Sequence, residues 1–341
     1  MKRKFNAFFT IGCALLIVIS GNSFAFAADN IQLTNDDMLL VNYGYPEESI
    51  DALSLEQRKE LVKALNDNPD NVKIETSVLE LDNLAEIESF MGTSDDVLVE
   101  MGADLSAIIS NRYELNEISK QTDVEIAAER DISLTEAKYL KKSIEKGRSE
   151  DNSYDCKDKD NAITASGSIS SSKLTYTQLY SNKSTSTAPS YNVTLTYNWI
   201  SPYTLTIFTD EIVTAWGGNL NSSNISAKAS YYYDRGTKWD TYFKQNAMTI
   251  NETVNKGIEF KFPQSIAGLS TQVRTKTGSA TFNIYQTKMQ GYDTKILSQY
   301  CHRVLSVGSA SIGISASGPS VGISVGGAWD TSPQRSTTIR Y

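Results

Sequence analysis

The chain has 341 residues, 32 basic and 40 acidic, and a formal net charge of −8. Charge is divided unevenly: residues 28–150 carry 28 Asp and Glu against 12 Lys and Arg, whereas residues 151–341 carry 12 against 17. A nucleic-acid reader needs a basic stripe to neutralise phosphates, so the acidic half is excluded from that class. The two halves also differ in hydrophobic periodicity. They predict an α+β, two-domain protein with a small all-α N-terminal domain followed by an antiparallel β-sandwich-like C-terminal domain.

Residues 1–27 are typical of a secretory signal peptide. Three basic residues, Lys2 to Lys4, precede an apolar run at 8–20, and Ala25-Phe26-Ala27 supplies small residues at the positions that signal peptidase requires. Nothing after residue 30 is apolar enough to predict a membrane span. We expect a secreted, extracellular protein that is cleaved after Ala27.

Residues 28–147 predict an acidic helical domain. Helix starts are indicated by Thr34 and Ser94, and by capping-box patterns at Ser54 and Ser133. Gly44, Gly102 and Gly147 follow apolar runs and predict helix ends. The acidic faces predict either solvated helix surface or intramolecular docking of this half on the more basic β half, as a cover would dock.

Residues 148–161 have no apolar periodicity and predict a linker. Cys156 lies in it, and Cys301 is the other cysteine that remains after the signal peptide is removed. An even pair in an exported protein predicts a Cys156–Cys301 disulfide, with two free thiols as the alternative.

Residues 162–341 predict a Ser/Thr/Tyr-rich antiparallel β domain. Apolar and polar residues alternate along 191–199 and again along 225–233. Period-two alternation is typical of strands with one face on a core. Many short strands and few helix signals favour a sandwich.

An amphipathic hairpin is predicted at 307–329, with a turn at Gly318-Pro319. Ala310, Ile312, Ile314 and Ala316 alternate with Ser and Gly, and so do Val321, Ile323 and Val325. Such a hairpin suits a sheet that has one face on a core, which we favour, because each arm has only three or four apolar positions. Membrane-inserting hairpins have the same pattern, since one face meets lipid and the other meets water.

No constellation of residues predicts a catalytic or metal site. His302 is the only histidine, so a histidine-rich metal site is excluded by count. Adjacent strand residues point to opposite faces, which argues against Cys301 and His302 as a nucleophile and its base. Nucleotide and metal-binding motifs are missing from the sequence, so we expect no cofactor. Isolated carboxylates leave a secreted hydrolase as a third hypothesis.

Aromatic side chains are the predicted binding residues. Tyr and Trp rings stack on sugar faces, and Trp216, Tyr232, Trp239 and Trp329 are less plainly inward than Trp199. We expect an exported, non-enzymatic binding protein of a Gram-positive bacterium, whose β domain contacts a cell-wall glycan or surface protein. The alternative is a membrane-active or pore-forming protein that uses the 307–329 hairpin, with the N-terminal domain as a cover.

Overall fold

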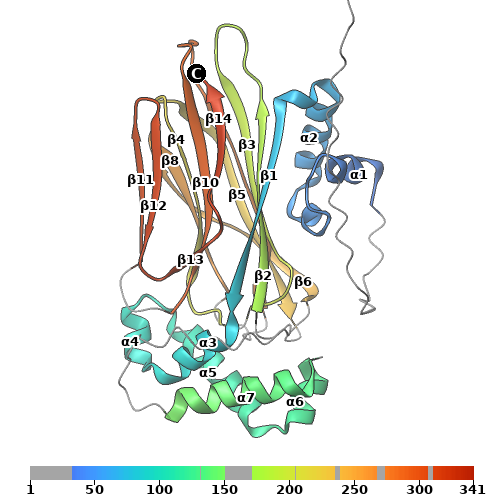
Figure 1. Cartoon of the computed structure of the whole chain (residues 1–341), viewed down its shortest axis with the longest axis vertical. Coiled ribbons are helices and arrows are strands. Elements are labelled where there is room, and N and C mark those ends of the chain that lie inside the picture. Colours follow the sequence, from blue (N-terminus) through green and yellow to red (C-terminus); the bar gives the residue numbers. More distant parts are fainter. Residues whose placement is uncertain are drawn as a thin grey trace, which may run out of the picture. The chain divides into compact units, whose positions relative to one another are not determined.

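The computed structural model describes residues 33–130, 132–149, 171–203, 205–234, 239–266, 273–305 and 310–341. By their contacts, Thr34–Tyr341 form one compact unit. The predicted signal peptide and residues 150–161 of the predicted linker, with Cys156, lie outside the described residues. The predicted fold class is confirmed, because helices fill most of the N-terminal part and antiparallel sheets make up the C-terminal part (Figure 1). The predicted domain boundaries at 147 and 162 stay a prediction.

The helices begin where the capping residues predict. The side chains of Thr34 and Ser54 each accept a hydrogen bond from the backbone three residues on, and both capping boxes are complete. Gly44 and Gly102 have φ angles of +94° and +89°, as helix ends require. The described helical elements are α1 (Asn35–Asn42), η1 (Glu47–Ala52), α2 (Leu55–Asp67), η2 (Pro69–Asn71), α3 (Asn83–Gly92), α4 (Asp95–Glu100), α5 (Leu105–Lys120), α6 (Asp123–Arg130) and α7 (Leu134–Ser149).

Gly147 does not end a helix, which corrects the sequence prediction. It lies inside α7, where a Cβ would approach the Cβ of Met91 in α3 to 2.7 Å. Helices pack this closely only where one of them presents a residue without a side chain. Gly147 is therefore a close-packing position between α3 and α7.

Two antiparallel six-stranded sheets face each other and form the sandwich. Sheet A has the order β1-β2-β3-β9-β5-β6, and sheet B has the order β13-β10-β4-β8-β7 with β14 also paired to β10. The strands are β1 (Val72–Asp82), β2 (Ser171–Asn182), β3 (Ser190–Trp199), β4 (Thr209–Trp216), β5 (Asn221–Asp234), β6 (Trp239–Ala247), β7 (Thr249–Thr253), β8 (Gly257–Pro263), β9 (Val273–Tyr285), β10 (Asp293–Arg303), β11 (Ser311–Ser317), β12 (Ser320–Gly326), β13 (Trp329–Thr331) and β14 (Arg335–Arg340).

Strand β1 comes from the acidic half and was not predicted. It pairs with β2 from Val72↔Ser181 to Asp82↔Ser171 and forms one edge of sheet A. Alternating burial along its second half shows that one face meets the sandwich. The acidic half is therefore helical except for this strand.

The core between the sheets contains the residues that period-two alternation predicts. Trp199, Tyr197 and Leu195 of β3 are completely buried in one cluster with Ala229 and Tyr231 of β5. The opposite face of β3 is also buried, because the N-terminal segment, which we define as α1 to α2 (residues 35–67), covers it through η1. Tyr45 Oη lies 3.1 Å from Thr196 Oγ1, and Asn198 donates to the carbonyl of Glu48 over 2.9 Å.

A second core joins α3–α7 to one end of the sandwich (Figure 1). Ile108, Leu140 and Ile144 are buried in one cluster with Ile207 and Phe208, from the connection between β3 and β4. The helices of the acidic half thus pack on the β half largely through apolar side chains. Burial of such side chains stabilises packing without depending on the opposite net charges.

Candidate functional site

The predicted binding residues lie in three different environments. Trp216 is completely buried, stacked on Phe282, and donates from Nε1 to the carbonyl of Leu220 over 2.8 Å. A ring with no exposed surface cannot contact a ligand, so the structure removes Trp216 from the predicted set. Trp329 is half-buried, with the guanidinium of Arg303 5.5 Å from its ring centroid.

Tyr232 and Trp239 are brought together on sheet A. Their ring centroids lie 6.4 Å apart at 69°, in an edge-to-face arrangement. Tyr242 packs against Tyr232 in the same way at 5.5 Å, and the ammonium group of Lys276 lies 4.9 Å from the Tyr232 ring centroid. We call Tyr232, Trp239, Tyr242 and Lys276 the aromatic patch.

The aromatic patch is a surface feature held by the sheet. Strand β6 is an edge of sheet A among the described strands, and Tyr242 on it is 54% exposed. Trp239 is fixed by a 2.7 Å hydrogen bond from its Nε1 to the carbonyl of Trp199. Because this bond occupies the indole N–H, Trp239 can offer a ligand only the surface of its ring. Tyr242 was not among the predicted binding residues, although Asp240, Tyr242 and Lys244 occupy alternate positions along β6, as residues on one face of a strand do.

Asp51 of the N-terminal segment interacts electrostatically with two residues of the aromatic patch. Burial raises the pKa of Tyr232, and the carboxylate of Asp51 adds to this shift. Burial lowers the pKa of Lys276, and Asp51 opposes that shift. Asp51 of η1 is thus electrostatically coupled to two members of the patch.

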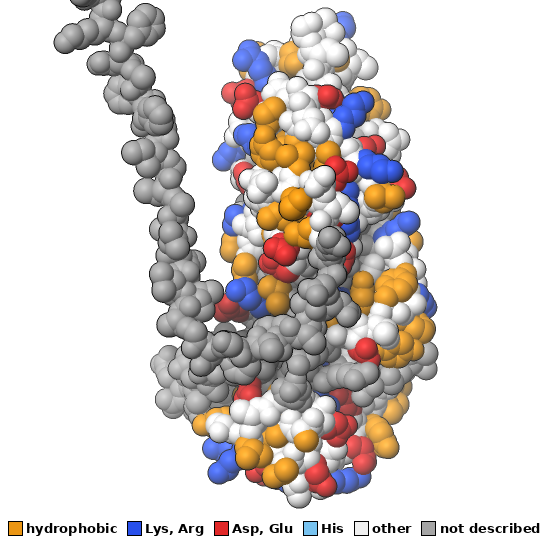
Figure 2. Space-filling view, turned by 90° about the vertical axis from the view of Figure 1, so that its right-hand side faces the viewer, with side chains coloured by type: hydrophobic (Ala, Val, Ile, Leu, Met, Phe, Trp, Pro, Cys, Tyr) orange, Lys and Arg blue, Asp and Glu red, His pale blue; other side chains and the backbone are white. Residues whose placement is uncertain are grey.

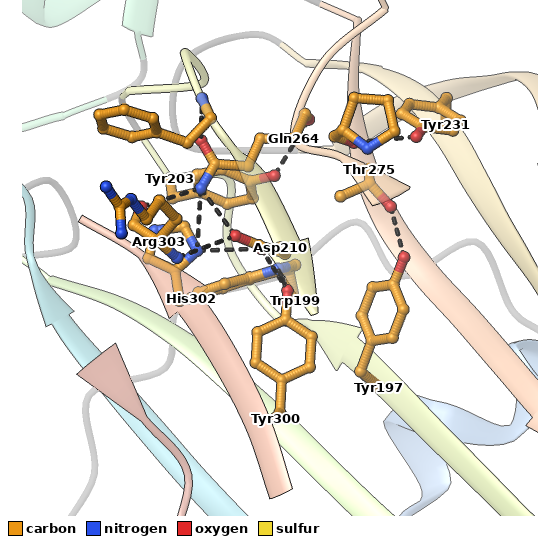
Figure 3. Close-up of polar contacts among 12 residues, drawn as sticks. Tyr197, Trp199, Tyr203, Asp210, Tyr231, Gln264, Thr275, Tyr300, His302 and Arg303 are labelled. Carbon is orange, nitrogen blue, oxygen red and sulfur yellow. Dashed lines mark hydrogen bonds and ion pairs between the residues drawn. The ribbon is translucent and has the colours of Figure 1, made fainter. Parts of the chain in front are cut away.

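A buried polar network lies where β4 and β10 meet the β3–β4 connection (Figure 3). One oxygen of Asp210 accepts from Tyr300 Oη over 2.5 Å and lies 3.0 Å from His302 Nδ1. The other accepts from Gln264 Nε2 over 2.7 Å and from the backbone N–H of Arg303 over 3.1 Å. The carboxylate is therefore fully hydrogen-bonded without water.

This arrangement favours the protonated form of His302. Burial disfavours its charged form, but the charge and hydrogen bond of Asp210, with smaller contributions from Glu86 and Asp330, together raise the pKa of His302. The rings of Trp199 and Tyr203 meet its ring edge-to-face at 5.2 Å. The side chain is 1% exposed. A substrate has no access to it, so the geometry indicates structural cohesion and not proton transfer.

Glu86 of α3 lies beside this network. Burial raises its pKa to about 7, and His302 opposes that shift. Its Oε2 atom is buried without a hydrogen-bond partner. The carboxyl group of Glu86, in the helical part, therefore interacts electrostatically with His302 and Asp210 of the sandwich.

Cys301 and His302 point to opposite sides of β10, as predicted from strand geometry. Cys301 is buried, and burial raises the pKa of its thiol, which makes it a poor nucleophile. It is a free cysteine in the described part of the chain. The predicted disulfide is not observed there, because Cys156 lies outside the described residues.

The described surface offers depressions in place of a deep cleft. Two of them have volumes of about 350 and 340 Å³; one is lined by Ser190, Asn283 and Tyr285, and the other by Thr294 and Pro319. On the face shown in Figure 2, hydrophobic side chains gather in small patches among polar ones. Within the described ranges, no three His, Cys, Asp or Glu side chains gather as a metal site would require. No described helix is both long and apolar enough to cross a bilayer.

No protein family model matches the sequence, and no curated protein matches it. Among solved structures, the KRT10-binding region domain of the pneumococcal serine-rich repeat protein PsrP is 13% identical, with 38% of this chain and 76% of that chain covered and a TM-score of 0.20. The C-terminal domain of the Streptococcus agalactiae AgI/II polypeptide BspA is 10% identical, with 38% and 53% covered and a TM-score of 0.23.

The C-terminal domain of the Streptococcus pyogenes antigen I/II-family protein AspA is 9% identical, with 50% of this chain and 54% of that chain covered and a TM-score of 0.24. This chain thus spans about half the length of the BspA and AspA domains. At TM-scores this low, the similarities carry no argument about function. The proposals below therefore rest on the residues of this chain.

Proposed function

We propose that this protein is an exported, non-enzymatic carbohydrate-binding protein that contacts a cell-surface glycan through the aromatic patch. The observation that carries the proposal is the edge-to-face grouping of Tyr232, Trp239 and Tyr242 on one exposed edge of sheet A. Aromatic ring faces pack against the C–H faces of sugar rings, and their polar rims accommodate hydroxyl groups.

Polar side chains beside the rings support a carbohydrate ligand. Gln245 is exposed on β6 and donates to Ser230 over 3.1 Å, and its amide retains hydrogen-bonding capacity. Lys276 adds a positive charge above Tyr232, which favours glycans that carry acidic groups. A chain-like glycan can lie along an open sheet edge, and so it needs no deep pocket.

The proposal is tested with Tyr242→Ala and a matched control. Tyr292 is another exposed tyrosine, 65% exposed against 54% for Tyr242, and it lies outside the patch against Tyr341. Purified Gram-positive cell walls, and a panel of immobilised glycans, serve as probes. We expect binding to weaken at least about tenfold for Tyr242→Ala, the range of a hot-spot aromatic, and to be unchanged for Tyr292→Ala.

Circular dichroism checks that both variants keep the native sheet content. Equal binding by Tyr242→Ala and the native chain would remove the aromatic patch from the site. Binding to walls that survives removal of the glycans and is abolished by protease treatment of the walls would replace the carbohydrate with a protein partner.

A further inference from the structure

The hairpin β11–β12 is a separate element of the fold. Its strands pair with each other from Ser311↔Gly326 to Ser317↔Ser320. They form a two-stranded sheet of their own, with no ladder to another strand among the described residues. A two-stranded ribbon is marginally stable alone, so its position depends on what it packs against.

The hairpin lies beside β4 and β10 of sheet B (Figure 1). Its apolar face is the one turned toward the sheet, because Ser311, Ser315 and Ser317 are exposed whereas Ile312 and Ile314 are half-buried. Val213, Ala215 and Leu297 are buried, yet they do not belong to the core between the sheets. Strand alternation places them on the face of sheet B that points away from sheet A. A Cβ at Gly257 of β8 would lie 2.3 Å from the carbonyl oxygen of Thr214 in β4 and 2.9 Å from Cδ1 of Ile314, so the hairpin approaches sheet B closely at this glycine.

The turn of the hairpin is attached by a small number of polar contacts. The backbone N–H of Gly218 donates to the carbonyl of Gly318 over 2.6 Å, and Thr294 Oγ1 donates to the carbonyl of Pro319 over 2.7 Å. The apolar side chains beneath stay half-exposed, Ile312, Ile314 and Ile323 among them. Packing this shallow resists detachment less than burial in a core does.

The hairpin and its flanks contain no charge. Between Arg303 and Asp330 the sequence has no Asp, Glu, Lys or Arg, and the outward face of the hairpin carries Ser and Gly. Soluble proteins usually protect free strand edges with charged residues or proline within the strand. This hairpin has neither protection, and it can leave water without desolvating a charge.

We propose that β11–β12 is a membrane-inserting hairpin, stored on the outer face of sheet B. On release, Ile312, Ile314, Val321 and Ile323 would face lipid tails, and the serine face would line water. Because a lone hairpin leaves backbone groups unpaired in the bilayer, several copies must join edge to edge into a closed barrel. Strands β11 and β12 have seven residues each, so a spanning strand of about ten residues would also have to include part of the uncharged flanking sequence.

The acidic half does not cover the hairpin. Its α1–α2 segment contacts sheet A, for example through Gln57 Nε2 and Thr281 Oγ1 at 2.6 Å, on the other side of the sandwich (Figure 1). Among the described residues, the hairpin has its main contacts with β4 and β10, and Ile314 also lies close to Gly257 of β8, so these are the strands from which release would separate it. This differs from the sequence-based alternative, in which the N-terminal domain acts as the cover.

The test is a reversible covalent lock on the hairpin turn. Thr294→Cys and Pro319→Cys are introduced together, since the Thr294 side chain contacts the Pro319 carbonyl. Vesicles of phosphatidylcholine and phosphatidylglycerol are loaded with a self-quenched dye and mixed with the full chain. We expect the native chain and the reduced double variant to release dye, and the oxidised variant to release it at least about tenfold more slowly. Native chain with and without reductant controls for the reductant itself.

A second pair of variants tests which face meets lipid. Ile323→Asp places a charge on the apolar face, whereas Ser324→Asp places the same charge on the exposed serine face next to it. We expect dye release to fall at least about tenfold for Ile323→Asp and to persist for Ser324→Asp, because charge is tolerated on the water-facing side of a barrel. Intact vesicles with the native chain, or equal release by the oxidised lock, would overturn the proposal.

Discussion

His302 Nδ1 lies 3.0 Å from Asp210 Oδ2, and both side chains are buried, at 1% and 0% exposed. The pair joins β4 to β10 at the point where Tyr300, Gln264 and the backbone of Arg303 also bond to the carboxylate. Because Asp210 accepts from all of them, it is the centre of the network in Figure 3. Its removal would leave several buried donors without an acceptor.

Asp210→Asn should therefore destabilise the fold strongly. The amide keeps the volume of the carboxylate and loses the negative charge that stabilises protonated His302. We expect the free energy of unfolding to fall by about 3–5 kcal/mol, the range for breaking a buried ion pair by removing one partner. Urea unfolding followed by tryptophan fluorescence measures it. Asp293→Asn, at an exposed position of β10, is the control and should unfold like the native chain.

Stability should decrease as pH rises from 5 to 8, and Glu86→Gln should weaken that dependence. Burial raises the pKa of Glu86 to about 7, so the folded state holds a proton that the unfolded state releases near 4.5. The folded state then binds more protons between these values, and stability is lost as pH rises through them. The raised pKa of His302 acts in the same direction, since its contribution is lost above the folded-state pKa.

Between pH 5 and pH 8, we expect the free energy of unfolding of Glu86→Gln to fall by about 2 kcal/mol less than that of the native chain. Urea midpoints at the two pH values measure the effect, with the exposed Glu100→Gln as a control. An unchanged pH dependence in Glu86→Gln would show that the carboxyl group is not protonated in the folded protein.

Tyr45→Phe tests the attachment of the N-terminal segment to sheet A. The hydroxyl donates to the carbonyl of Ser49 over 2.9 Å and lies 3.1 Å from Thr196 Oγ1, and the ring is 1% exposed. Loss of the hydroxyl should cost about 1 kcal/mol and raise amide exchange locally in η1 and β3. Tyr43→Phe is a matched control, because Tyr43 is 46% exposed on the same segment. Equal exchange in the two variants would contradict a specific role for Tyr45.

Gly147→Ala should destabilise the protein despite the better helix propensity of alanine. Alanine gains about 1 kcal/mol in an exposed helix interior. Here its Cβ would come within 2.7 Å of the Met91 Cβ, which is too close for a carbon pair. Overpacking of this kind costs about 1–3 kcal/mol, so we expect a net loss measured by thermal unfolding. Lys142→Ala, on the exposed side of α7, should be close to neutral. A more stable Gly147→Ala variant would mean that α3 moves away without cost.

The sequence by itself determined the elements of this protein. Capping boxes at Thr34 and Ser54 depend on residues three apart, and period-two alternation marks the inward face of β3, so both can be read without knowledge of the fold. The helical N-terminal part, the antiparallel β part and the amphipathic hairpin follow from such local patterns. Strand β1 was missed, since its flanking helices and acidic composition outweighed a weak alternation.

Only the tertiary structure decided which surfaces meet. Asp210 and Gln264 are 54 positions apart and become partners through sheet register and loop position, which no local pattern encodes. The same holds for Trp216, which alternation left ambiguous and which the second sheet buries, and for Tyr242, which joins Tyr232 across neighbouring strands. The hairpin was predicted from alternation, but its packing on the outer face of sheet B, against β4 and β10, was not, because it depends on tertiary contacts. Local interactions choose helix or strand, whereas burial of side chains distant in sequence chooses partners.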